Sequence, residues 1–231
     1  MANLNLSSMP IRLQMLTTPR DFKRNILKGM RAELTKKLTS SAFKTSIHRG
    51  VRIMLGEALQ SQDEYLSMVT QDGKLRAELG VADSNSVMDS LVRDWVRSVN
   101  VRVAPPRVLG DRIVGTVVSA TAIQSDYHDV LDKAYASYTT EKGQEIPWLD
   151  WLLTKGVSIM VATHHSLQLP NVRSRTGTNT VMVKTKGQGW GVPTEYAGTP
   201  ENNYAQRAVM EVVKEGGPLE QLMTQEVRRR F

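Results

Sequence analysis

The adjacent histidines His164 and His165 are the first residues of this chain that could hold a metal ion or act as catalytic bases. Neighbouring residues of a strand point to opposite faces, so the two imidazole rings could reach one ion only if the strand were bent. We therefore expect both histidines to have structural or surface roles. An enzyme with an unrecognised site around His164, His165 and Asp129 is kept as an alternative.

Three aspartates, Asp126, Asp129 and Asp132, recur at every third position and could share one face of a helix. A calcium-binding loop would contain a glycine and a further ligand, which this segment lacks. The spacing therefore favours a solvated acidic face over a metal site.

The sequence also lacks the usual patterns of nucleophilic catalysis and of nucleotide binding. No serine lies in a nucleophile elbow, and His48 and His128 fall within helical patterns, where packing or surface roles are expected. The glycines of residues 186–191 match neither the phosphate-loop nor the dinucleotide-binding pattern, so they predict a flexible turn. The chain has no cysteine, which excludes disulfides, thiolate zinc sites and cysteine nucleophiles. We predict a protein that is not an enzyme and that needs no cofactor and no metal ion.

The length and composition are typical of a folded, soluble chain. Its 231 residues suffice for one large domain or for one domain with appendages. Hydrophobic residues make up 40% of the chain, and the mean hydropathy is −0.32. The N-terminal segment lacks the pattern of an export signal, and no apolar run approaches the roughly 18 residues of a membrane span. We therefore expect no membrane partner.

The chain is basic, with a formal net charge of +7 and a pI near 9.7. Such a charge attracts polyanions in a salt-dependent manner. The excess is spread along the sequence, and only Arg228, Arg229 and Arg230 form a run. Aromatic residues are not interleaved with the basic ones, as a stacking platform for nucleic acid would require. A solvated basic surface is the favoured interpretation, and nucleic-acid binding stays open as an alternative.

The N-terminal part of the chain is predicted to contain a long amphipathic helix. Thr18 suits the cap and Pro19 the first helical position, and the helix should run to about Leu38. Its apolar residues recur at helical spacing and form one stripe. The stripe includes Phe22, Ile26, Met30 and Leu34.

Further helices and strands are predicted along the chain. Helices are expected over residues 43–59 (interrupted by Gly50 and Gly56), over 84–99, over 126–135, from Pro147 to a stop at Gly156, after a cap at Asn202 or Asn203, and after Gly216-Gly217-Pro218. A hairpin is expected from the strand over residues 99–103, which Pro105-Pro106 stops, and the β-branched segment 113–123. Two more strands are expected within residues 157–169 and over 180–185.

The predicted fold class is α+β, with N-terminal helices followed by a small, mostly antiparallel sheet, flanking helices and a C-terminal helix. We predict an extended N-terminal arm over residues 1–17, a helical region over 18–99, an α+β domain over 100–215 and a basic C-terminal tail helix over 216–231.

Four strings in the second half of the chain carry a resemblance to a known family. They are YTTEKGQEIPWLDWLLTKG (residues 138–156), SRTG (174–177), VMV (181–183) and WGVPTEYAGTPENNYAQRAV (190–209). In this order they resemble the virion structural proteins of tailed bacteriophages and prophages that belong to the neck or tail-completion type. Three of the four tryptophans of the chain, Trp148, Trp151 and Trp190, lie in the same segment.

The resemblance implies a structural protein without catalysis, in which residues 100–215 form a tail-completion-like domain. It implies a homo-oligomeric ring, of six or twelve copies, in the neck that joins the DNA-filled head to the tail, with genomic DNA passing through the channel. The neighbours would be the portal adaptor, the tail terminator and the collar, and the virion would be assembled in the bacterial host cytoplasm. The alternatives are a tail terminator or other ring that caps the tail tube, and a basic DNA-binding protein.

Ring formation buries two different surfaces of each subunit, and aromatic and arginine side chains dominate such interfaces. We therefore expect Trp190, Pro193 and Tyr196 to be interface anchors, together with Arg173 and Arg175 on the polar loop that precedes them. The alternative for Trp190 is a place in the core of its own domain.

Overall fold

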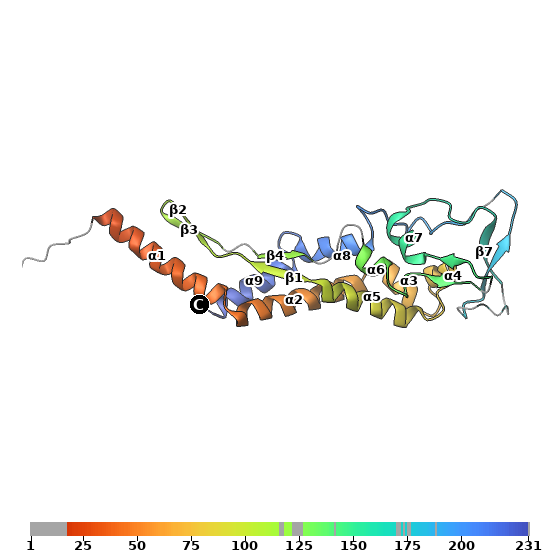
Figure 1. Ribbon diagram of the computed structural model, residues 1–231, viewed down its shortest axis with the longest axis horizontal. Coiled ribbons are helices and arrows are strands. Elements are labelled where there is room, and N and C mark those ends of the chain that lie inside the picture. Colours follow the sequence, from red (N-terminus) through yellow and green to blue (C-terminus); the bar gives the residue numbers. More distant parts are fainter. Residues whose placement is uncertain are drawn as a thin grey trace, which may run out of the picture. The chain divides into compact units, whose positions relative to one another are not determined.

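The structure is a computed structural model that describes residues 18–115, 118–121, 127–140, 142–169, 172, 174, 177–187 and 189–230. These residues form helices and small antiparallel ladders, which confirms the predicted α+β class (Figure 1). The strands pair two by two, in place of the single small sheet that we predicted. Within the described ranges, no helix has the length and apolar character needed to cross a bilayer.

Contacts divide the chain into two compact units. Unit 1 comprises Met1–Ser40 and Val103–Val117, and unit 2 comprises Ser41–Arg102 and Val118–Phe231. This division differs from the predicted boundaries near residues 99 and 215, because the segment after residue 102 packs with the first helix and the C-terminal helix packs with the second. The arm predicted over residues 1–17 lies outside the described residues.

Unit 1 contains the long N-terminal helix and a hairpin. These are α1 (Pro19–Leu38) and the antiparallel strands β2 (Arg107–Leu109) and β3 (Arg112–Val114). Helix α1 has the predicted bounds, because Thr18 Oγ1 accepts a hydrogen bond from the Asp21 backbone N–H at 3.1 Å and so caps the first turn.

The hairpin is held to α1 by polar contacts as well as by packing. The Lys23 ammonium group lies 2.7 Å from the Asp111 carboxylate, and Arg31 Nε donates to the Pro106 carbonyl at 3.1 Å. The predicted hairpin over residues 99–123 is split into two ladders, β2–β3 and a second one described below. Pro105 and Pro106 lack the N–H that a ladder needs, which explains the interruption.

Four helices form the core of unit 2. They are α2 (Ser41–Gln60), α5 (Ser84–Ser98), α8 (Tyr204–Val213) and α9 (Pro218–Arg228). Helix α2 contacts the other three, and Figure 1 shows it beside α5. Trp95 of α5 and Tyr204 of α8 are fully buried and meet edge to face, with ring centroids 5.4 Å apart.

Helix α2 continues through Gly50 and Gly56, where an interruption was predicted. A Cβ atom on Gly50 would overlap the Leu222 side chain of α9. The glycine therefore allows the two helices to approach closely, so the residue that weakens the helical pattern marks a packing contact.

Short elements complete unit 2. The helices are α3 (Asp63–Val69), α4 (Lys74–Leu79), α6 (His128–Leu131) and α7 (Trp148–Thr154). The ladders are β1 (Asn100–Val103) with β4 (Val118–Thr121), β5 (Tyr138–Thr139) with β6 (Glu145–Ile146), and β7 (His164–Gln168) with β8 (Thr180–Lys184).

Asn203 joins three segments of unit 2 while it caps α8. Its Oδ1 accepts a hydrogen bond from the Gln206 backbone N–H at 3.1 Å, in the position predicted from the sequence. Its amide nitrogen donates to Tyr127 Oη at 2.6 Å, to the Leu153 carbonyl at 3.1 Å and to the Thr199 carbonyl at 2.8 Å. The side chain is fully buried, so these bonds fix the start of α8 against α7 and the loop that precedes α8.

Candidate interaction surfaces

Trp190, which we expected to anchor an interface, lies in the interior of unit 2. Only 5% of its surface is exposed. The indole N–H donates to Glu78 Oε2 of α4 at 2.9 Å, and the ring packs against Trp151 of α7 with centroids 5.8 Å apart. The Trp190 side chain is therefore buried by contacts within unit 2. This agrees with the alternative that placed it in the core of its own domain.

The segment over residues 189–199 is fixed on α7 by its backbone. The Gly156 N–H donates to the Gly198 carbonyl at 2.9 Å, and the Gly198 N–H donates to the Leu152 carbonyl at 3.2 Å. A Cβ atom on Gly198 would lie 2.6 Å from the Leu152 oxygen and 2.6 Å from Asn203 Cβ. Glycine is required there because no side chain fits between these groups.

Pro193 and Tyr196 remain partly exposed on the same segment. The Tyr196 N–H donates to the Pro193 carbonyl at 2.9 Å and closes a turn between them. The Tyr196 ring borders a shallow hollow that also exposes Leu66 of α3. This hollow, which we call the Tyr196 hollow, is lined by Asp63, Leu66, Ser67, Thr70, Asp72, Gly73, Lys74, Glu195 and Tyr196.

An ion pair between Lys74 and Glu195 borders the Tyr196 hollow. The hydrogen bond from Lys74 lowers the pKa of the Glu195 carboxyl, and the same bond raises the pKa of Lys74. The two side chains are 53% and 47% exposed, so solvent screens the pair and its contribution to stability is small. Both charges are therefore accessible to a partner that covers the hollow.

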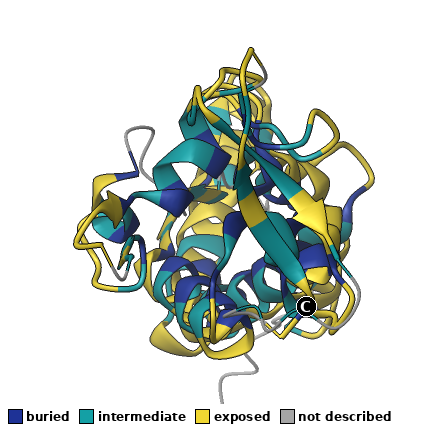
Figure 2. Ribbon diagram, turned by 90° about the vertical axis from the view of Figure 1, so that its right-hand side faces the viewer, coloured by how far each residue is buried: buried dark blue, intermediate teal, exposed yellow. Residues whose placement is uncertain are grey.

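Arg173 and Arg175 lie outside the residues that the structure describes, so their role stays a prediction. In the sequence they fall between β7 and β8. These two strands pair with His165 opposite Val183 and Leu167 opposite Val181, and neither strand contains a buried residue (Figure 2). Every residue of the ladder that flanks the two arginines is thus at least partly exposed.

The residues considered for catalysis lie in separate elements. His164 and His165 are neighbours in β7 and take part in different cross-strand pairs, as predicted. Asp129 lies in α6, and Asp126 lies outside the described residues. In the described part of the chain, no three histidine, aspartate or glutamate side chains gather as a metal site requires.

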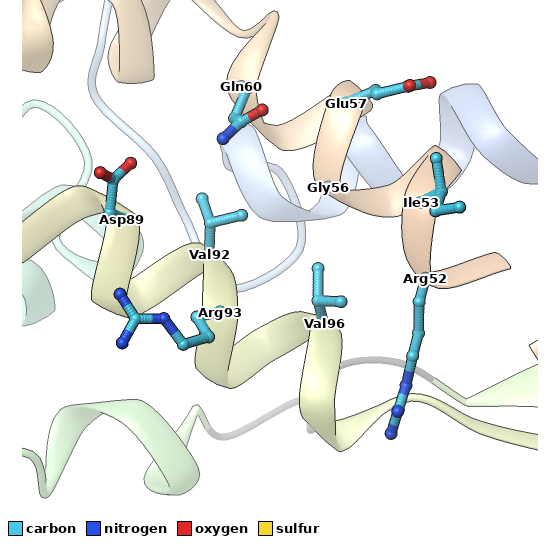
Figure 3. A pocket seen from close by; sticks show the side chains of 9 residues that line it. All are labelled: Arg52, Ile53, Gly56, Glu57, Gln60, Asp89, Val92, Arg93 and Val96. Carbon is cyan, nitrogen blue, oxygen red and sulfur yellow. The ribbon is translucent and has the colours of Figure 1, made fainter. Parts of the chain in front are cut away.

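A second shallow hollow lies between α2 and α5 (Figure 3). Val92 and Val96 of α5 point toward α2, and a Cβ atom on Gly56 would lie 3.6 Å from Val96 Cγ2, an ordinary packing distance. Two charged side chains of its rim are engaged within unit 2: Arg52 donates to the Arg97 carbonyl at 2.9 Å, and Asp89 accepts from Tyr65 at 2.9 Å. An apolar floor with a rim of both charges suits contact with another protein surface.

The basic run at the C-terminus takes part in packing. Arg230 donates to Glu226 at 3.0 Å, and its guanidinium group lies 5.4 Å from the centre of the Phe43 ring. Arg229 lies 3.7 Å from the same carboxylate. Arg230 therefore packs the end of α9 against α2, whereas Arg229 is 77% exposed and its ion pair lies within its own helix. The run Arg228 to Arg230 was the main local motive for the DNA-binding alternative.

Sequence reasoning missed Leu66, Lys74 and Glu78, which shape the surroundings of Trp190 and Tyr196. They lie in α3 and α4, which have seven and six residues and are too short to show a helical period. A carboxylate that accepts from an indole N–H 112 positions away has no local signature. The sequence offers no signal by which these three residues could have been found.

No protein-family model matches the chain, and neither a curated protein nor a solved structure matches it significantly. The surfaces described above are therefore interpreted from their own residues and from the strings that carry the phage resemblance.

Proposed function

We propose that this chain is a structural virion protein of a tailed bacteriophage, which forms a homo-oligomeric ring in the neck and joins the DNA-filled head to the tail. The observation that carries the proposal concerns the two longest strings of the resemblance, over residues 138–156 and 190–209. They are separated in the sequence and packed against each other in unit 2.

The contacts between these two strings are specific. Trp151 of the first string packs against Trp190 of the second, and the Leu152 carbonyl accepts from the Gly198 N–H. The buried Asn203 of the second string donates to the Leu153 carbonyl of the first. Packing of the two strings into one element is what we expect of strings that preserve a shared local fold.

A ring subunit presents two different surfaces, one to each neighbour. The Tyr196 hollow and the hollow between α2 and α5 are candidates for these surfaces, because each combines apolar side chains with a charged rim. Tyr196 stays the proposed anchor at the first of them, and Pro193 stays the proposed anchor on the turn beside it. Trp190 supports them by holding their segment on α7.

Electron microscopy and mass photometry of the purified chain test the proposal. We expect rings of six or twelve copies, formed either by the protein alone or after it is mixed with heads or tails of the parent phage. In the mixtures, we expect the protein only at the head–tail junction. A monomer that binds neither DNA-filled heads nor tails would contradict the proposal.

The same particles distinguish the position of the ring. Binding to DNA-filled heads would favour a head-side connector, whereas binding to isolated tails alone would favour the tail terminator or another ring that caps the tail tube. Labelling of intact virions with an antibody against the chain provides an independent check, since the label should lie between head and tail.

A further inference from the structure

The positive charge of the chain is concentrated in unit 1. Its segments, residues 1–40 and 103–117, contain ten of the 30 lysines and arginines but only three of the 23 aspartates and glutamates, a formal net charge of +7. This leaves 20 basic and 20 acidic residues for unit 2, whose formal net charge is zero. The basic excess, which we interpreted from the sequence as spread along the chain, therefore belongs to unit 1 and lies mostly in residues 1–40.

Most of these cations face solvent. Nine of the ten lie in described residues: Arg20, Lys23, Arg24, Lys28, Arg31, Lys36, Lys37, Arg107 and Arg112. Arg20, Arg24 and Lys28 follow one another at four-residue spacing, so they form one exposed row along α1. Arg24 and Lys28 have no ion-pair partner among the described carboxylates.

The hairpin adds a second exposed pair of cations. Leu109 is opposite Arg112 in the ladder, and Arg107 precedes Leu109 by two positions, so Arg107 and Arg112 share one face. Both are exposed, whereas Val108 and Ile113 on the other face are partly buried. Unit 1 therefore presents basic side chains from both of its elements.

We propose that unit 1 binds duplex DNA through these exposed lysines and arginines. The inference goes beyond the ring and does not depend on it, because it rests on the charge of unit 1 alone. Cationic side chains contact the phosphate backbone without reading base edges, so the expected binding is independent of DNA sequence and strongly dependent on salt.

The spacing of the row suits a duplex. An α-helix rises about 1.5 Å per residue, so the eight-residue step from Arg20 to Lys28 covers about 12 Å. A duplex carries about one phosphate charge per 1.7 Å of its axis, so roughly seven charges lie along that distance. These charges belong to both strands and surround the duplex, so phosphate density does not limit the number of contacts that the three cations of the row can make.

An anionic membrane is the other large polyanion, and α1 is poorly suited to it. A helix that lies on a membrane buries a continuous apolar face. The exposed apolar row of α1, Phe22, Ile26 and Met30, shares its face with Glu33 and Lys37, which follow Met30 by three and seven positions. These charges end the apolar row after Met30, so it is too short to be the continuous apolar face of a membrane-bound helix, and the observations favour DNA.

The test measures binding of the full chain to a labelled duplex of mixed sequence, by filter binding at several salt concentrations from about 50 to 200 mM. We expect R24Q/K28Q to weaken binding and to reduce the slope of log K against log salt by about 2, because each phosphate contact contributes about 0.9. The matched control is K133Q/K142Q, which removes the same charge from two exposed lysines of unit 2 and should leave the slope unchanged. Circular dichroism should show the same helix content in all three proteins.

Three results would overturn the inference. They are absence of binding at about 50 mM salt, equal losses in the two double variants, and binding to vesicles of anionic lipid in preference to the duplex. Ring assembly by R24Q/K28Q is expected to match that of the unmodified chain. A failure to bind DNA and a failure to form rings are therefore separate observations.

Discussion

At the scale of single residues, Trp190 and Tyr196 lie six positions apart but have different surroundings. Trp190→Ala is expected to lower the free energy of unfolding by about 3–5 kcal/mol, because it empties a buried site against Trp151. Tyr196→Ala should cost about 1 kcal/mol or less, since the ring is partly exposed, but it should weaken ring assembly. Urea unfolding followed by circular dichroism, together with mass photometry, measures both effects. Equal stability losses in the two variants would contradict the assignment of core and surface.

Buried tyrosines make the stability of unit 2 sensitive to alkaline pH. Burial raises the pKa of Tyr204 well above its ordinary value, and burial followed by the hydrogen bond to Asp94 raises the pKa of Tyr135. Because the folded-state pKa is raised, the stabilisation is present below the unfolded-state pKa of about 10 and is lost as the pH rises beyond it. We therefore expect the urea midpoint to fall above about pH 10.

Tyr204→Phe tests this origin of the pH dependence. The Tyr204 hydroxyl is buried and has no hydrogen-bond partner in the described part of the chain, so its removal should not lower stability at neutral pH. The loss of stability at alkaline pH should become smaller in the variant. A fall of the urea midpoint that is as large as in the unmodified chain would show that other groups cause it.

At the scale of secondary-structure elements, two helix caps are expected to differ in how much they stabilise the protein. In both, the side-chain oxygen accepts a hydrogen bond from the backbone N–H three residues later. Asn203→Ala is expected to cost about 2–4 kcal/mol, the sum of a lost cap and of the buried Leu153 carbonyl that loses its donor. Thr18→Ala removes an exposed cap and should cost about 1 kcal/mol or less. Urea unfolding compares them, and a cost for Asn203→Ala no larger than that for Thr18→Ala would show that its amide bonds contribute little.

Local signals predicted the long helices well, and they predicted the short helices and the strand pairings poorly. Helix α1 has the predicted bounds and α5 ends one residue before the prediction, because caps, a first-turn proline and a long apolar period act within a few residues. The ladder of β5 and β6, with two residues in each strand, was missed because it is shorter than any alternating pattern. Gly50 could not be explained from its neighbours in the sequence, because the side chain that favours glycine there, Leu222, lies on another helix.

The surfaces were predictable only in part, because they too depend on contacts between residues that lie far apart in the sequence. The sequence indicated the segment that carries Trp190, Pro193 and Tyr196, but it could not tell which side chain faces inward. That depends on Glu78 and Trp151, which approach from two other helices. The charge of unit 1, in contrast, could have been read from the sequence. Residues 1–40 hold eight lysines and arginines but only two aspartates and glutamates, and residues 103–117 hold two basic residues and one acidic residue.

At the scale of the whole molecule, the two units should respond differently to salt. The like charges of unit 1 repel one another, and salt shortens the range of that repulsion to about 10 Å at 0.1 M. We expect added salt to increase the hydrogen-exchange protection of α1 amides and to leave α2 and α5 unchanged, because the net charge of unit 2 is zero. Hydrogen-exchange mass spectrometry measures this contrast. A uniform response of all helices would contradict the separation of charge between the units.

The division into units also separates the chromophores of the chain. All four tryptophans and all six tyrosines lie in unit 2, and Phe22 is the single aromatic ring of unit 1. Near-ultraviolet absorption and intrinsic fluorescence therefore report on the unfolding of unit 2 and do not detect the unfolding of α1. Unfolding of α1 changes only the far-ultraviolet signal. An emission-detected unfolding curve can look two-state while unit 1 has already unfolded, and only a second optical probe reveals the difference.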